Sequence, residues 1–166
     1  MRIARLHDAE YRLELHPHEM RLLWYLLQLY PLLPADYHRI TRQTDAQPLA
    51  GAQELLEQSM ASREAEQKRY LAEFLGRRDR LRRHGREFHI HVSGDDMERL
   101  LQLLNDVRVG SWVRLGCRMD PDDGVESADP REAVLREAMR RCAWMQMLVL
   151  EALHPGLGYA PVPPAN

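Results

Sequence analysis

The sequence predicts a single α+β domain, mainly α-helical, in which about four helices pack with a small antiparallel sheet of two or three strands. Apolar residues recur at three- and four-residue spacing along several long stretches, which is typical of helices. In shorter stretches they alternate with polar residues, which is typical of strands. A chain of 166 residues, 45% of them hydrophobic, can also bury a core without a metal or a disulfide.

The strands are expected near the N-terminus and in the middle of the chain. Residues 2–6 and 11–15 read as two strands, and the turn between them predicts a hairpin. Residues 87–92 alternate strictly between polar and apolar side chains, which predicts a third strand that joins the hairpin.

The first two helices are separated by a loop-like stretch. Pro17 suits the first turn of a helix, which then runs towards Pro31. A long, strongly polar helix is expected over residues 49–83, with Gly76 as a point where it bends or divides. Residues 33–48 between them are expected to form a surface loop or a short helical turn.

The stretch 93–116 is expected to be the central helix, because its apolar residues fall on nearly every side. Ser93 is its expected N-cap. The last helix begins at Pro130 and is expected to cross the central helix at Gly110 and Ser111, where small residues let a backbone come close. The domain therefore covers residues 1–154.

Two segments are expected to lie outside the packed elements. Residues 118–129 are acidic and rich in turn-forming residues, which predicts a solvated loop. Residues 155–166 are rich in proline and glycine, which predicts an extended or disordered tail.

The composition predicts a cytoplasmic protein. Cys117 and Cys142 are too few for a disulfide framework, so both are expected to be reduced thiols. The first 15 residues alternate polar with apolar, unlike a signal peptide, and no apolar run is long enough for a membrane span. The formal net charge of -2 excludes a whole-protein attraction to nucleic acid or to an acidic membrane.

Four polar residues interrupt the apolar central helix, namely Asn105, Asp106, Arg108 and Arg114. Burying a charge without a partner is costly, so these groups must be paired or reach a surface. One interpretation is a small anionic ligand held by the arginines. The other, which we favour, is a structural network that fixes helix packing and caps neighbouring segments.

His89 and His91 lie two residues apart on one face of the expected strand, a spacing that can present two imidazoles to one metal. A third ligand would come from the residues that flank the strands, which are His7, His16, His18, Asp95 and Asp96. The alternative, which we favour, is that the pair belongs to the polar face of a half-exposed strand.

The stretch RRDRLRRHGR, residues 77–86, is the candidate for phosphate binding, and the candidate contacts are Arg77, Arg78, Arg82 and Arg83. Aromatic residues interleaved for base stacking would strengthen this prediction. The favoured alternative is a solvated helix end, for which the acidic residues 120–132 offer an internal or intersubunit partner.

The motif LNDVRVGSWVRLG, which ends at Gly116, is similar to a motif in bacterial domain-of-unknown-function proteins often encoded beside the Clp protease adaptor in actinobacteria. The resemblance is carried by Asn105, Asp106, Arg108, Leu115 and Gly116 and extends loosely to the order of the elements. The resemblance implies no known reaction. It implies instead a regulatory role connected with proteolysis.

No phosphate-binding glycine loop, HExxH, GxSxG or paired-carboxylate signature is present in the sequence. We therefore expect a non-catalytic interaction or regulatory module that binds another protein or a second copy of itself as a homodimer, with no cofactor. One alternative is a metal-binding protein or enzyme that uses His89 and His91. The other is nucleic-acid binding through residues 77–86, although nucleic acid is not the expected partner.

Overall fold

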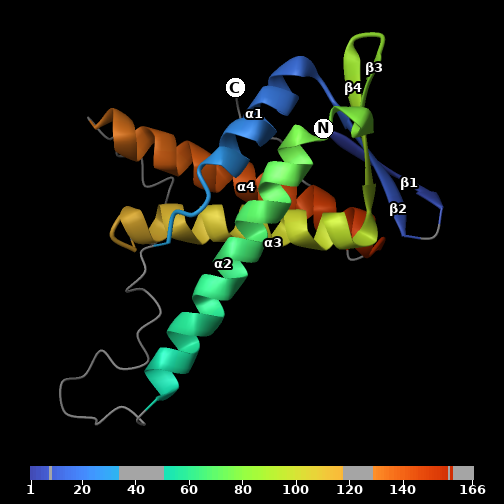
Figure 1. Cartoon of the computed structure of the whole chain (residues 1–166). Helices are drawn as coiled ribbons and strands as arrows, with labels where there is room; N and C mark the ends of the chain where they lie inside the picture. Colours follow the sequence, from blue (N-terminus) through green and yellow to red (C-terminus); the bar gives the residue numbers. More distant parts are fainter. Residues whose placement is uncertain (8, 34–50, 118–128, 157, 159–166) are drawn as a thin grey trace.

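The computed structural model describes residues 1–7, 9–33, 51–117, 129–156 and 158. In these ranges the chain is mainly helical, with four α-helices and a four-stranded antiparallel sheet (Figure 1). The elements in chain order are β1 (Arg2–His7), β2 (Glu10–Leu15), α1 (Pro17–Gln28), α2 (Ala52–Gly76), the 3-10 helix η2 (Arg78–Arg80), β3 (Leu81–His84), β4 (Glu87–Ser93), α3 (Gly94–Arg114) and α4 (Pro130–Leu153). The predicted fold class is confirmed.

The sheet has the strand order β1-β2-β4-β3. The predicted third strand joins the N-terminal hairpin, with Leu13 opposite Ile90 and Tyr11 opposite Val92. Alternation along β2 and β4 places these four side chains in the core, and it turns the polar residues of both strands to the other face.

The prediction of a helix over residues 49–83 is wrong beyond Gly76, and the sheet has four strands where two or three were predicted. After η2, the chain forms β3 and turns back into β4 through Gly85 and Arg86. Gly85 has a φ of 60°, the left-handed conformation that two-residue hairpin turns require and that glycine adopts without strain. The arginines after residue 80 therefore belong to a hairpin and not to a solvated helix end.

α3 is the central helix, as predicted. The Ser93 hydroxyl accepts from the Asp96 backbone N–H at 3.1 Å, and the Asp96 carboxylate accepts from the Ser93 N–H at 3.0 Å. The fully or nearly fully buried apolar side chains of α3 are Met97, Leu100, Leu103, Leu104 and Val107. Each contributes about 1.5–3 kcal/mol through burial, which makes α3 the main contributor to the core.

The close approach at Gly110 involves a different segment from the one predicted. A Cβ at this position would lie 2.5 Å from the Leu32 Cβ and 3.0 Å from the Leu33 nitrogen. Glycine at this position thus admits the chain that follows α1. Arg114 holds the same segment, because its Nε donates to the Leu32 carbonyl at 2.8 Å.

The two halves of α2 have different surroundings. In the second half Gln67, Leu71 and Phe74 are buried. In the first half, residues 52–62, which the structure describes completely, no side chain is buried. Figure 1 shows α2 crossing α3, with its first half extending away from the other described elements.

Several expected segments lie wholly or mainly outside the described residues. They are the loop over residues 33–48, the acidic loop over residues 118–129 and most of the tail over residues 155–166. Within the described part of the chain, no helix has the length and apolar character needed to cross a membrane.

Candidate functional site

The four polar residues of α3 contact groups within the fold. Asn105 Oδ1 accepts from Arg108 Nη2 at 3.1 Å and, across the α3–α4 interface, from Gln146 Nε2 at 3.5 Å. Asp106 lies 4.0 Å from Arg63 of α2, and Arg114 binds the Leu32 carbonyl. These contacts link α3 to α2, to α4 and to the segment after α1. Binding of an anion by the two arginines stays a prediction.

Cys142 of α4 lies in the core. Burial raises the pKa of its thiol to about 12, although the nearby Arg108 opposes this shift. The thiol is therefore protonated at neutral pH, which is the unreactive form.

Asp96, which the sequence indicated as a possible third metal ligand, is a polar centre of the fold. Its carboxylate accepts from the Tyr70 hydroxyl at 3.0 Å and from Arg80 Nη1 at 2.7 Å, in addition to its bond with the Ser93 N–H. Burial would raise the pKa of Asp96, but the hydrogen bonds from Ser93 and Tyr70 and the Arg80 charge lower it below its usual value. The carboxylate thus joins α2, η2 and the start of α3.

A groove of about 460 Å³ lies beside Asp96, between the second half of α2 and the start of α3. Its walls carry four arginines, Arg69, Arg77, Arg80 and Arg99, and four acidic residues, Glu66, Glu73, Asp95 and Asp96. Arg99 is held by Glu66 at 3.0 Å and lies over the Tyr70 ring at 5.1 Å. The four positive and four negative side chains balance, so their summed charge favours neither an anion nor a cation.

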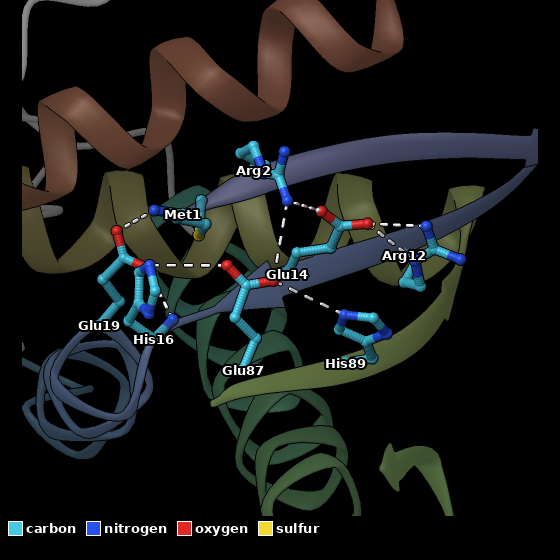
Figure 2. A network of polar contacts seen from close by, with 8 residues as sticks. All are labelled: Met1, Arg2, Arg12, Glu14, His16, Glu19, Glu87 and His89. Atoms are coloured by element: carbon cyan, nitrogen blue, oxygen red, sulfur yellow. Dashed lines mark hydrogen bonds and ion pairs between the residues drawn. The ribbon is translucent and has the colours of Figure 1, made fainter. Parts of the chain in front are cut away.

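The polar face of the sheet carries a network of ion pairs (Figure 2). Glu14 pairs with Arg2 at 2.8 Å and with Arg12 at 2.7 Å. The hydrogen bond from Arg12 is the main reason that the pKa of Glu14 is lowered. Glu87 lies among Arg2, His16 and His89, at 3.7, 3.5 and 3.9 Å. Both carboxylates are therefore surrounded by cationic or ionisable nitrogen groups.

His89 and His91 lie on this polar face. His89 is opposite Glu14 of β2 and Arg82 of β3, while His91 is exposed and opposite Arg12. Across the described residues, no group of three or more His, Cys, Asp or Glu side chains is arranged to hold a metal ion. A metal bound by the two histidines stays a hypothesis, and its third ligand is not among the side chains the structure places.

The arginines proposed for phosphate binding are distributed over the end of α2, η2 and β3. Arg77, Arg82 and Arg83 are exposed, and Arg83 Nε donates to the Gly85 carbonyl at 3.2 Å. The side chain of Arg78 is not among those that the structure describes. The hairpin also brings together two rings that the linear sequence did not pair, since His84 of β3 stacks on His89 of β4 with their centroids 5.0 Å apart.

The first half of α2 presents apolar side chains without burying them. Leu55 is 68% exposed, and Leu56 and Met60 are partly exposed. Glu54 and Glu57 are also exposed, and their hydrogen bonds are to the neutral side chains Gln58 and Gln53. The sequence predicted a helix here but not that this half would lie outside the core.

Comparison with protein-family models, with characterised proteins and with solved structures gives no match to this chain. The resemblance of the LNDVRVGSWVRLG motif to the bacterial family accordingly stays a prediction.

Proposed function

We propose that the protein is a non-catalytic interaction module that binds another protein through the first half of α2. The occupant that we propose is a partner helix with an apolar stripe bordered by lysine or arginine. The observation that carries this proposal is the 68% exposure of Leu55 on a helical segment that extends beyond the packed elements.

The apolar character of this segment supports docking by a helix. Leu56 and Met60 are four residues apart and continue the side of α2 on which Gln67 and Phe74 are buried. Leu55 widens this surface. An amphipathic partner helix that packs along this surface would bury these three side chains against its own apolar face, as in helix-in-groove recognition.

The charge of the segment specifies the partner further. Residues 52–62 contain two glutamates and no basic residue, and the hydrogen bonds that the glutamates make with other described side chains are to neutral glutamines. Opposite charges at the rim of an interface steer association and select the partner. We therefore expect basic residues beside the apolar stripe of the partner helix.

The setting that we propose is cytoplasmic, and the motif resemblance makes a component of regulated proteolysis the first partner to test. The polar groups around Asp96 support a structural role over a catalytic one, because its carboxylate is bonded to three donors within the fold.

A model peptide tests the chemistry of this surface directly. The probe is a short fluorescent helical peptide in which leucines form one stripe and lysines flank it, and the comparison peptide has glutamate in place of lysine. Fluorescence anisotropy should show binding of the leucine–lysine peptide only. Leu55→Glu should abolish this binding, because a carboxylate would then lie in the apolar contact. Val134→Glu is the matched control, since Val134 is 42% exposed on α4.

The test on the natural partner uses a photo-reactive amino acid at position 55 in living cells, with the same group at position 134 as the control. Two findings together support the proposal. The first is a protein that crosslinks at position 55 and not at position 134, with the crosslink in a basic amphipathic helix. The second is that this partner, once purified, fails to bind the Leu55→Glu variant. Joining to a second copy of this chain would overturn it in favour of a homodimer. Equal binding of both model peptides would also overturn it.

A further inference from the structure

The hairpin formed by β3 and β4 is rich in basic residues. Residues 81–91 contain three arginines and three histidines and only one carboxylate, that of Glu87. Its tip lies far from the first half of α2 in Figure 1. The hairpin therefore offers a second, separate surface of opposite charge.

The one carboxylate of this stretch does not neutralise the hairpin arginines. Glu87 is close to Arg2, His16 and His89. Arg82 and Arg86 are exposed and have no acidic partner among the described side chains. Their guanidinium groups are available to bind phosphate.

Beside these arginines is a stacking surface. The rings of His84 and His89 are 5.0 Å apart with an angle of 21° between their planes. His84 is exposed at the edge strand β3, whereas His89 lies between Glu14 and Arg82 in the register of the sheet. Because His84 is exposed, its ring has surface left for a further planar group.

The register also places the stacking ring and a guanidinium side by side. Arg82 and His84 are two residues apart in β3, so both project from the polar face of the sheet. Arg82 is directly opposite His89. Recognition of single strands combines cationic groups that follow the backbone with flat side chains on which bases stack.

We propose that the polar face of the β3–β4 hairpin binds single-stranded nucleic acid. A base stacks on His84, which is backed by His89, while Arg82 and Arg86 bind the flanking phosphates. This inference is independent of the proposed docking of a partner helix on α2.

The test is fluorescence anisotropy of the full chain with labelled single-stranded RNA and DNA of about 12 nucleotides, a length that spans a site of ordinary size. Salt is varied between about 50 and 200 mM. The expected result is salt-sensitive binding. Tighter binding of RNA than of DNA would show that the ribose hydroxyl is recognised, whereas equal binding would show recognition of any single strand. The Arg82→Gln, Arg86→Gln double variant should lower the slope of log affinity against log salt by about 1.4, because two phosphate contacts are lost.

His84→Ala separates stacking from charge attraction. It should weaken binding about fivefold or more while the salt slope stays the same, since a lost stacking contact releases no counterions. Arg5→Gln is the matched control, because Arg5 is an exposed arginine on β1 at the other edge of the sheet. All of the substituted side chains are exposed, so these variants are expected to fold.

Four results would overturn the proposal. The first is no binding at the lowest salt. The second is equal weakening by Arg5→Gln and by the hairpin variants. The third is equally tight binding of a duplex of the same length. The fourth is displacement of the oligonucleotide by a polyglutamate peptide at equal charge concentration. Either of these two results would show that the protein attracts any polyanion and has no stacking site.

Discussion

The two halves of α2 have the same secondary structure but opposite relations to the fold. The second half buries Gln67, Leu71 and Phe74, and its polar groups reach α3 through the Gln67–Gln102 and Tyr70–Asp96 hydrogen bonds. The first half buries no side chain and exposes Leu55. The difference shows that helical periodicity predicts the secondary structure of a segment. Whether its side chains are buried depends on which other elements pack against it.

The largest effect expected from this comparison is at Phe74. Its ring lies 6.1 Å from Trp24 and 5.8 Å from Tyr70, measured between centroids, so it packs α2 against α1. Phe74→Ala should lower the free energy of unfolding by about 3–5 kcal/mol, because it leaves a cavity in the core. Urea unfolding followed by circular dichroism measures this change. A loss below about 1 kcal/mol would show that the second half of α2 is not held as the structure has it.

A smaller effect is expected at the polar anchor of the same half. Asp96→Ala keeps the Ser93 cap but removes the carboxylate that accepts from the Ser93 N–H, the Tyr70 hydroxyl and Arg80. We expect a loss of about 2–3 kcal/mol, which combines the loss of the reciprocal bond of the capping box with the cost of unpaired donors. Asp95→Ala is the control, because Asp95 is exposed in the same turn and should cost less than about 1 kcal/mol. Equal losses would reduce Asp96 to an ordinary first-turn acid.

The same carboxylate predicts a dependence on pH. Because the folded-state pKa of Asp96 is lowered, its stabilising contribution is present above the unfolded pKa of about 3.9 and is lost as the pH falls through the folded-state pKa. Urea midpoints measured from pH 7 down to acid should therefore fall more steeply for the natural protein than for Asp96→Asn. The two proteins should differ most at neutral pH and converge in acid. Parallel curves would contradict the assigned pKa direction.

The smallest effect on stability is expected in the first half of α2. Leu55→Ala should change the free energy of unfolding by less than about 0.5 kcal/mol, because Leu55 is already 68% exposed. The measurement is the same urea unfolding, with Phe74→Ala beside it. A loss of 2 kcal/mol or more would mean that Leu55 is covered within the folded chain, and it would remove the basis for docking at this surface.

The parts of the fold that depend on local pattern could be predicted from the sequence. The alternation of residues 87–92 and the apolar stripes of α3 correctly predicted a strand and a helix, because the apolar side chains of both patterns are the ones that the fold buries. β3 could not be predicted in the same way, since three of its four residues are charged or ionisable. It is a strand because Gly85 turns it back onto β4 and Leu81 pairs with Ile90.

The candidate sites were less predictable than the fold, for a related reason. Tyr70 and Arg80 lie 26 and 16 positions from Asp96 in the sequence, so no local spacing indicates that they meet. The stacking of His84 on His89 depends on the register of a hairpin whose first strand, β3, was predicted to be the end of a helix. The glycine at position 85, followed by a strand of period two, is the signal that would have indicated this hairpin.

The strand order has a consequence for synthesis of the chain. β2 is complete by residue 15, yet its partner β4 begins only at Glu87, with Leu13 pairing with Ile90. At a translation rate of roughly 5–20 residues per second, the first hairpin waits about 4–15 s on the ribosome before its second edge is covered. During that interval Leu13 and Leu15 lack the β4 residues that they lie opposite in the folded protein. The N-terminal hairpin is therefore the part of the nascent chain that we expect a chaperone to recognise.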